Sequence, residues 1–269
     1  MEIITSKTNP RVKSAAALLD RRERKKTGLF LLEGARLCAD AAQNGVTVET
    51  LFLTEAAAEK YPAEAALLQK TAKQAFLLSE AAAEKLSDTR NSQHIFCVCQ
   101  RKEGDAPVDP RGLYVFLDNV QNPDNLGAVS RTAEALGFDG LIVSGGCEVD
   151  SPKALRASMG ALLRFPVTAA PDGAAWLAAR RAEGMRLLAT VPDRAADDIT
   201  KLTLSTGAVL VIGNEGSGVS EQTLALCTDR VTIPMAGKAE SLNAAAAAAI
   251  AMWEISRKSS VGSRKSRMG

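Results

Sequence analysis

The 269-residue sequence predicts an α/β protein with a mostly parallel sheet covered by helices on both faces, preceded by a smaller α/β domain. Three observations lead to this prediction. Apolar runs of strand length alternate with helical segments, which is typical of α/β folds. Hydrophobic residues make up 46% and charged residues 24% of the chain, as in a folded globular protein. A polar stretch with two prolines and two glycines, residues 100–112, interrupts the alternation and indicates a linker.

The region before the linker contains four apolar runs of strand length, and the first two each lead into an alanine-rich helical segment. Strands alternating with helices indicate a small α/β domain of its own, which we place at residues 1–105. The four predicted strands are residues 30–34, 48–54, 75–78 and 94–99.

The region after the linker, residues 106–269, alternates more regularly. We expect a mostly parallel sheet here. We also expect Asp124 or Asn125 to cap the helix after the first strand. The basic tail at residues 258–269 is expected to be disordered. The predicted strands are residues 113–118, 140–144, 165–168, 186–191, 208–213 and 230–235, and the predicted helices are residues 151–158, 173–182, one beginning near 125 and a long one reaching 253.

Composition argues against several classes of protein. No apolar stretch reaches the roughly 18 residues of a membrane span, and the N-terminus lacks the apolar core of a signal peptide, so a cytoplasmic location is expected. The five cysteines include no CxxC pair, which argues against a disulfide framework or a zinc site, and we interpret Cys97 and Cys99 as ordinary buried thiols. His94 is the only histidine, so we expect it to be structural rather than part of a metal cluster or a Ser-His-Asp triad.

Positive charge is concentrated at the two ends of the chain. Residues 1–26 contain eight Lys and Arg against three acidic residues, and residues 257–269 contain five against none. Because the net charge is only +2, this segregation indicates an anionic partner, and nucleic acid is the obvious one. Solubilising termini explain the pattern equally well at this point. The candidate RNA-binding residues are Lys7, Arg11, Lys13, Arg21 and Arg22, followed by Arg24, Lys25 and Lys26.

Three of the predicted strands run into loops of unusual composition, at the strand ends where parallel α/β sheets carry their sites. The first loop, residues 118–127, is rich in Asn, Asp and Pro, and a turn with a helix cap would explain much of it. A cap does not explain Arg131. This side chain lies about one and a half to two turns into the following helix, from where it can reach over the strand ends.

The second loop, residues 213–219, contains three glycines directly after a strand. Glycine permits close approach of the backbone to a ligand, although a plain glycine turn is an equally good interpretation. The loop matches neither the GxGxxG fingerprint of dinucleotide-binding folds nor a P-loop, so it does not by itself indicate a nucleotide cofactor.

The third loop runs from Ile233 to Asn243 and leads into six consecutive alanines at residues 244–249. Ser241 would serve as the N-cap of the alanine-rich helix. The alanines would allow this helix to pack closely against another backbone. Both structural interpretations are compatible with a functional role for the loop.

Together the three loops resemble the motifs of the SpoU (TrmH) family of RNA ribose 2′-O-methyltransferases, in the SPOUT superfamily. The first motif is matched by NPDNLGAVSRT, the second by VIGNEGSGVS and the third by IPMAGKAESLNAAAAAAI, in the family's order and spacing. The resemblance covers about residues 113–257. The segments TSKTNPRVK and FLLEGARL near the N-terminus also resemble the family's RNA substrate-binding domain, which is similar to ribosomal protein L30e.

The resemblance implies a catalytic domain with a C-terminal trefoil knot, a feature too rare to be predicted from periodicity. It implies a homodimer with the active site near the subunit interface. It implies S-adenosylmethionine as the methyl donor, with no metal. Arg131 would be the central catalytic residue, completed by Asn125, Glu215, Ser241 and Asn243. The residues that would contact the donor are Thr190, Gly213, Ile233, Met235 and Leu242.

The residue types suit this chemistry. Transfer of a methyl group from a sulfonium requires an oxygen nucleophile aligned about 3 Å away. The ribose 2′-hydroxyl is a poor nucleophile and requires a proton acceptor or electrostatic help. Because arginine stays protonated in proteins, we interpret Arg131 as a clamp on the substrate phosphate that also stabilises developing alkoxide charge. Proton removal by Arg131, as proposed for relatives, is the alternative.

Other functions remain open from the sequence. The same fold can act on transfer RNA, or serve without catalysis as an RNA-binding factor in ribosome assembly. The presence of Arg131, Glu215 and Asn243 argues against the non-catalytic alternative. A nucleotide-binding oxidoreductase is disfavoured because the dinucleotide fingerprint is missing. By analogy with ribosomal members that carry a separate L30e-like domain, we expect ribosomal RNA to be the substrate.

Overall fold

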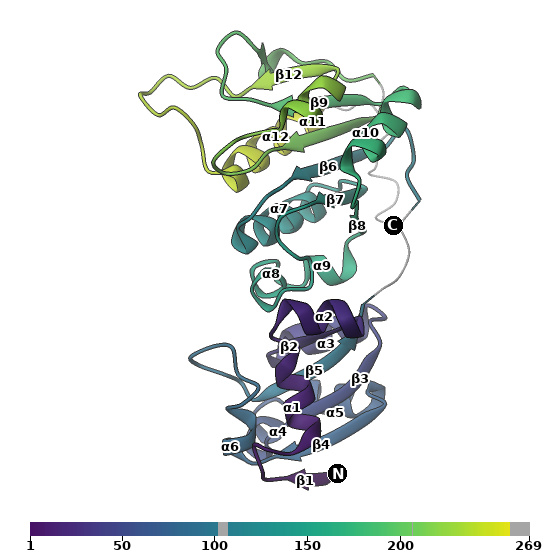
Figure 1. The fold of residues 1–269 in the computed structure, drawn as a ribbon, viewed down its shortest axis with the longest axis vertical. Helices are drawn as coiled ribbons and strands as arrows, with labels where there is room; N and C mark the ends of the chain where they lie inside the picture. The colour runs from purple at the N-terminus through teal and green to yellow at the C-terminus, as the bar shows by residue number, and fades with distance from the viewer. Residues whose placement is uncertain (102–106, 206, 259–269) are drawn as a thin grey trace. The chain divides into compact units, whose positions relative to one another are not determined.

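The computed structural model describes residues 1–101, 107–205 and 207–258. The predicted tail, apart from Lys258, and the middle of the predicted linker lie outside these residues. By its internal contacts the chain divides into two compact units, and Figure 1 labels many of their elements. Unit 1 comprises Met1–Glu103 together with Asp150–Arg164, and unit 2 comprises Gly104–Val149 and Phe165–Gly269.

Unit 1 contains a five-stranded mixed sheet. Its strands are β1 (Glu2–Ile4), β2 (Leu29–Glu33), β3 (Val48–Leu53), β4 (Gln74–Leu78) and β5 (Ile95–Gln100). The strand order is β1-β4-β3-β5-β2, and β5 runs antiparallel to both of its neighbours. All four strands predicted for this region are observed. The short strand β1 escaped prediction because only one of its three side chains, Ile4, is buried, which leaves no apolar run to detect.

The described part of unit 1 also contains eight helices. They are α1 (Pro10–Ala17), α2 (Arg21–Thr27), α3 (Ala35–Gln43), α4 (Glu55–Lys60), α5 (Pro62–Thr71), α6 (Glu80–Ala83), α8 (Pro152–Ala157) and α9 (Ala161–Arg164). The first two begin at Asn9 and Asp20, whose side chains accept hydrogen bonds from backbone N–H groups of the first turn. Gly28 ends α2 in the left-handed conformation that glycine adopts without strain. The basic N-terminal segment is therefore folded into helices.

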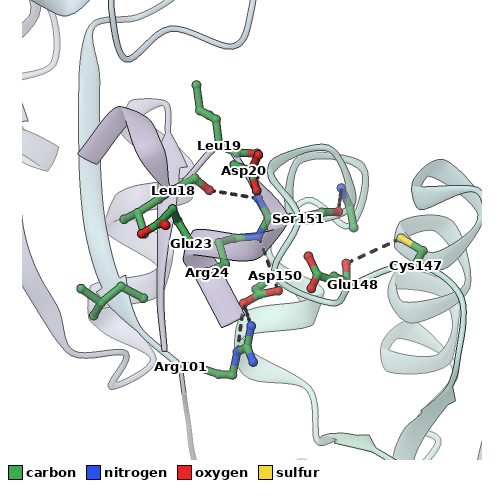
Figure 2. A network of polar contacts seen from close by, with 12 residues as sticks. Leu18, Leu19, Asp20, Glu23, Arg24, Arg101, Cys147, Glu148, Asp150 and Ser151 are labelled. Atoms are coloured by element: carbon green, nitrogen blue, oxygen red, sulfur yellow. Dashed lines mark hydrogen bonds and ion pairs between the residues drawn. The ribbon is translucent and has the colours of Figure 1, made fainter. Parts of the chain in front are cut away.

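Asp150 joins the α8–α9 segment to the rest of unit 1 (Figure 2). Its carboxylate accepts a hydrogen bond of 2.9 Å from Nε of Arg101 and lies 3.9 Å from Nε of Arg24. Arg24 is only 4% exposed, and its Nη1 donates to the carbonyl groups of Leu18 and Leu19, both at 2.9 Å. Arg24 therefore stabilises the fold and does not belong with its exposed basic neighbours.

Unit 2 contains a seven-stranded sheet in which every pairing is parallel, which confirms the predicted parallel α/β fold. The strand order is β10-β12-β9-β11-β6-β7-β8. The last strand ends at Thr232, three residues earlier than predicted, close to Pro234, which cannot donate a ladder hydrogen bond. The strands are β6 (Leu113–Asp118), β7 (Gly140–Ser144), β8 (Val167–Ala169), β9 (Arg186–Thr190), β10 (Asp197–Asp198), β11 (Ala208–Ile212) and β12 (Asp229–Thr232).

The helices of unit 2 are α7 (Pro123–Ala135), α10 (Gly173–Ala182), α11 (Glu221–Leu226) and α12 (Ala244–Lys258), with a 3-10 turn η1 at Ile199–Lys201. Helix α12 packs against α7 through a buried face that includes Ala248, Ala251 and Met252. The small alanines permit close packing here, as expected from the sequence. None of the described helices is long and apolar enough to cross a membrane.

Candidate active site at the strand ends

The first two loops leave neighbouring strands, β6 and β11, and are bonded to each other. Asp118, the last residue of β6, is 9% exposed, and its Oδ2 accepts a hydrogen bond of 2.8 Å from the N–H of Ser220. The side-chain amide of Asn214 donates to the carbonyl of Asn119 at 2.9 Å. These bonds bring residues about a hundred positions apart together beyond the end of the sheet.

Glu215 binds the second loop to the start of α7. Its carboxylate accepts hydrogen bonds from the N–H groups of Gln121 and Asn122, both at 3.0 Å, and from Nδ2 of Asn125 at 2.8 Å. Partial burial disfavours the charge on Glu215, but the hydrogen bonds outweigh it and lower the pKa of this carboxyl below its ordinary value. Glu215 is therefore an ionised acceptor at neutral pH, held in place by three donors.

Asn125 connects the first loop to the third. It is 5% exposed, and its Oδ1 accepts a hydrogen bond of 3.1 Å from Nδ2 of Asn243. Asn243 in turn accepts from the N–H groups of Ala245 and Ala246, at 2.9 and 3.2 Å. One chain of amide and carboxylate groups thus runs from Glu215 through Asn125 to the start of α12.

The helix caps differ from those predicted. Helix α7 begins at Pro123 and is capped by Asn122, whose side chain accepts from the N–H of Asp124, so neither Asp124 nor Asn125 is the cap. Helix α12 begins after Asn243, which accepts from its first turn, so Ser241 is not the cap either. Several residues in each loop have side chains able to cap, and Pro123 at the first helical position decides the choice in α7.

Glycine is required at position 213 because the backbone of the same loop lies too close to leave room for a side chain. A Cβ atom at this position would lie 2.1 Å from the carbonyl carbon of Gly218 and 2.1 Å from the nitrogen of Val219. The loop folds back on itself because Asn214 and Gly218 exchange two backbone hydrogen bonds of 2.9 Å. Gly218 has φ +71°, which a glycine adopts readily. The backbone of this loop therefore approaches itself closely at Gly213, and a contact of Gly213 with the donor stays a prediction.

The third loop offers unpaired backbone and accessible apolar groups. Across residues 233–242, no backbone or side-chain hydrogen bond to another described residue is formed. Leu242 is 39% exposed, and Ile233 and Met235 are partly exposed. On the neighbouring strand, Thr190 donates from Oγ1 to the carbonyl of Val211 at 2.9 Å. Apolar surface beside unpaired N–H and C=O groups suits a flat ring with a hydrogen-bonding edge.

Arg131 and Ser241 are not part of this series of hydrogen-bonded side chains. Both side chains are exposed, and neither forms a hydrogen bond or ion pair with any residue that the structure describes. The structure thus brings Asn125, Glu215 and Asn243 together and leaves these two side chains available to a substrate. In the described part of the chain, no group of three or more His, Cys, Asp and Glu side chains is arranged to hold a metal ion.

Sequence reasoning missed two residues whose side-chain hydrogen bonds connect the first two loops, Asp118 and Asn214. Asp118 ends an otherwise apolar strand, and a single acidic residue at that position was a usable signal. Asn214 gave no such signal, because its role depends on a hydrogen bond to the carbonyl of Asn119. Asn119 itself adopts a positive φ of +57°. Such a contact between distant loops is not encoded in local spacing.

The predicted RNA-binding residues lie on unit 1, and all of them except the buried Arg24 are exposed. Lys7, Lys13 and Arg22 extend from the N-terminal segment, α1 and α2. Arg21 is also exposed. Arg11 is already engaged, since its guanidinium lies 4.7 Å from the centre of the Phe76 ring and 3.8 Å from Glu2. The structure therefore retains an exposed basic face in which Arg11 is partly committed to the fold.

Comparison with known proteins identifies the two regions. A family model described as the SpoU rRNA Methylase family matches residues 112–253, and one described as the MRM3-like substrate binding domain matches residues 9–97. A parallel α/β unit with this bonded set of strand-end loops, joined to a substrate-binding region, is a methylase acting on RNA. The two matches together account for most of the described residues.

Similar proteins extend over nearly the whole chain. The 23S rRNA (guanosine(2553)-2′-O)-methyltransferase RlmP of Bacillus subtilis is 32% identical over 257 residues, which are 95% of this chain and 99% of that protein. The AdoMet complex of AviRb from Streptomyces viridochromogenes is 32% identical with a TM-score of 0.82, covering 93% of this chain and 97% of that one. An AdoMet-bound rRNA methyltransferase from Sinorhizobium meliloti is 30% identical with a TM-score of 0.84, covering 95% and 97%. The chain belongs to the SpoU rRNA methylase family.

Proposed function

We propose that this protein methylates a ribose 2′-hydroxyl in 23S ribosomal RNA with S-adenosylmethionine as the donor. The observation that carries the proposal is the chain of hydrogen bonds from Glu215 through Asn125 to Asn243, which holds the three family motifs in one arrangement. Relatives named for 2′-O-methylation of 23S rRNA match almost the full length of the chain. With ribosomal RNA as substrate, we place the reaction in the cytoplasm.

The residues of the third loop fit the donor. When bound, S-adenosylmethionine supplies an electrophilic methyl group carried on a sulfonium. The partly exposed side chains of Ile233, Met235 and Leu242 would provide apolar contacts for the donor, and the unpaired backbone groups of residues 233–242 would supply hydrogen bonds to it. Thr190 is the last residue of β9, and Gly213 directly follows the neighbouring strand β11. We therefore assign both residues to the donor site at this edge of the sheet.

The protein side of the reaction consists mainly of positioning and charge. Arg131 holds the phosphate beside the target ribose and stabilises the negative charge that develops on the 2′-oxygen. Glu215 does not remove the proton, because its oxygens already accept three hydrogen bonds and its pKa is lowered. We assign Asn125, Glu215 and Asn243 to positioning the loops, and Ser241, which is exposed, to contact with the substrate.

A trefoil knot is part of the proposal. Strand β12 lies on the far side of β9 from β11, yet the helix that follows it packs against α7 and β11. Near the end of that helix, Nζ of Lys258 donates to the carbonyl of Ile199 at 2.8 Å, within the connection between β9 and β11. This return of the chain across the sheet supports a C-terminus threaded through that connection.

A homodimer is also part of the proposal. The outer face of α12 exposes Ala246, Ile250 and Trp253, which follow one another at helical spacing. Ile250 is 42% and Trp253 52% exposed, whereas the opposite face of the helix is buried. Apolar side chains grouped in this way indicate an interface. We assign this face to the contact between two copies of the chain.

We assign RNA recognition to the N-terminal region, an L30e-like domain at residues 1–105, and catalysis to residues 106–269. The match of residues 9–97 to a substrate-binding model supports the first assignment, and the match of residues 112–253 to the methylase model supports the second. The exposed basic residues Lys7, Lys13, Arg21 and Arg22 supply the charge that RNA binding requires.

The proposed function is tested with purified full-length protein, methyl-labelled S-adenosylmethionine and unmodified ribosomal and transfer RNA. We expect label in 23S rRNA at a nucleotide whose ribose becomes resistant to alkaline cleavage. Label in transfer RNA alone would replace the substrate in the proposal. Binding of RNA and donor without transfer would favour a non-catalytic assembly factor.

A further inference from the structure

Unit 1 contains a cavity of about 470 Å³ that methyl transfer does not use. It lies between the start of α3 and the α8–α9 segment, so its wall is formed by two distant parts of the sequence. Sites for small molecules range from about 300 to 1,000 Å³. The cavity is therefore large enough to hold one nucleotide.

Three arginines line this cavity, and one of them has no partner. Arg36 is exposed and forms no ion pair or hydrogen bond with the described residues. Arg156 donates to Asp88 at 2.6 Å, and Arg164 is bonded to Asp40. The positive charges of Arg156 and Arg164 are each partly balanced by the carboxylate that they bind. Arg36 therefore supplies the positive charge available to an anionic ligand.

The acidic groups in the wall are occupied. Glu33 is 9% exposed and accepts hydrogen bonds from the N–H of Asp88 at 3.0 Å and from the hydroxyl of Thr89 at 2.6 Å. Asp40 is held by Arg164. Because their oxygens are already engaged by donors of the protein, these carboxylates repel an anion in the cavity less than free ones would.

Gln93, which is bonded to the start of α3, adds a hydrogen-bond donor to the cavity. The helix begins after Gly34, which provides no side-chain cap, and the N–H of Ala35 donates to Oε1 of Gln93 at 2.8 Å. The amide nitrogen of Gln93 has no partner among the described residues and can donate to a ligand. The positive end of the helix dipole reinforces the charge of Arg36.

Apolar side chains form the remaining wall. Leu37 is partly buried, and Met159 is 52% exposed with φ +50°. A large apolar side chain held in this conformation at the surface is unusual. The flat face of a nucleobase packs well on such side chains, and methionine adapts to its shape. The cavity thus offers an anionic site beside an apolar one, with an amide between them.

We propose that this cavity binds one unpaired nucleotide of RNA, with Arg36 on the phosphate, Leu37 and Met159 against the base, and Gln93 on the base edge. The proposal rests on the proposed function only for the choice of RNA as the ligand. It differs from the exposed basic face of α1 and α2, because it requires the α8–α9 segment as well as the N-terminal region.

The test uses the full-length protein and a fluorescent oligouridylate of about eight nucleotides, a length suited to single-strand sites. Anisotropy titrations compare wild type with Arg36→Ala, Arg36→Lys and Met159→Ala. Loss of one arginine–phosphate contact should weaken binding about tenfold and reduce the slope of affinity against salt by about one. Arg36→Lys should restore part of the affinity, because it keeps the charge without the fork. Arg90→Ala removes an exposed arginine outside the cavity wall and should leave binding unchanged.

Competition identifies the ligand. Uridine 3′,5′-bisphosphate should displace the oligonucleotide from wild type, and Arg36→Ala should lose this effect. Inorganic phosphate competing as well as the nucleotide would overturn recognition of the base, and equal RNA affinity in wild type and Arg36→Ala would overturn the site altogether. If binding depends on Arg36 while wild type transfers no methyl group to ribosomal RNA, the proposed function fails and the nucleotide site stands.

Discussion

The side-chain amide of Asn243 donates a hydrogen bond of 3.1 Å to the side-chain oxygen of Asn125. The nitrogen of the same Asn125 amide donates to Glu215 at 2.8 Å, so both ends of one buried amide are used. An amide donates at one end and accepts at the other without any change of protonation. The identity of Asn125 is therefore fixed by two partners, from the second and third motifs.

Asn125→Asp should disconnect the motifs. It replaces the donor facing Glu215 by a second carboxylate, and an unsatisfied buried group costs about 1–3 kcal/mol. We expect a lower melting temperature, faster amide exchange in residues 119–125 and little methyl transfer. Gln222→Glu, an exposed substitution on α11 that adds the same charge, is the control. Wild-type exchange rates in Asn125→Asp would show that the bonds do not hold the loops.

Glu215 should make stability depend on pH. Its pKa is lowered in the folded protein, so its contribution is present above the unfolded pKa of about 4.3 and is lost as the pH falls through the lower folded value. In urea titrations from neutral to acidic pH, Glu215→Gln should be less stable than wild type. The difference should shrink below about pH 4.3. A difference that does not change with pH would contradict the assignment.

Arg24 and Arg22 should behave differently although they lie two residues apart. Arg24 is buried beside Asp150, and breaking a buried pair costs about 3–5 kcal/mol. Arg24→Ala should therefore lower the free energy of unfolding by about that amount. Arg22→Ala should change it by no more than about 0.5 kcal/mol and should instead weaken RNA binding. Equal effects of both substitutions on stability would refute this division.

Much of the fold could be predicted from sequence because its strands are apolar runs. The strands at residues 113–118 and 208–213 correspond to β6 and β11, within one residue at each end. Helix caps were predicted less well, since neighbouring Asn, Asp and Ser residues compete for the same role. The pairing of Arg24 with Asp150 could not be predicted, because the two residues are far apart in sequence and neither position shows a periodic pattern.

The candidate site was predictable in part. The three loops were found because unusual residues collect at strand ends. The bonds among Asn125, Glu215 and Asn243 were not foreseen, since they depend on the order of strands in the sheet. Glycine at position 213 was left open between a plain turn and close approach to a ligand, and the structure adds that the backbone of Gly218 and Val219 lies where a side chain would be.

Arg131 carries most of the proposed chemistry. Arg131→Ala should leave the fold intact, because the side chain is exposed and has no partner among the described residues. The affinity for S-adenosylmethionine should stay near wild type, while methyl transfer falls about a hundredfold or more. Arg131→Lys should rescue poorly, because lysine lacks the bidentate fork. Calorimetry measures the affinity for the donor, and single-turnover assays measure the rate of methyl transfer. Near-normal transfer in Arg131→Ala would remove Arg131 from the mechanism. Lost donor binding would move it to the donor site.

The outer face of α12 should control the oligomeric state. Trp253→Glu places a charge within the proposed interface and should shift sedimentation from two chains to one, with loss of activity. The same Gln222→Glu substitution serves as the control, because it adds a charge to α11 instead. A wild-type protein that sediments as a fully active single chain would exclude the dimer.

The assignment of Asp150–Arg164 to unit 1 limits how this protein can be divided. A chain cut near residue 105 would separate Arg24 and Arg101 from Asp150, and would leave the buried side chains of Leu155 and Leu162 without their surroundings. Unit 1, to which we assign RNA recognition, therefore cannot be exchanged between relatives by replacing the N-terminal region alone. A working chimera would have to carry the internal segment as well, so the two stretches are expected to change together in evolution.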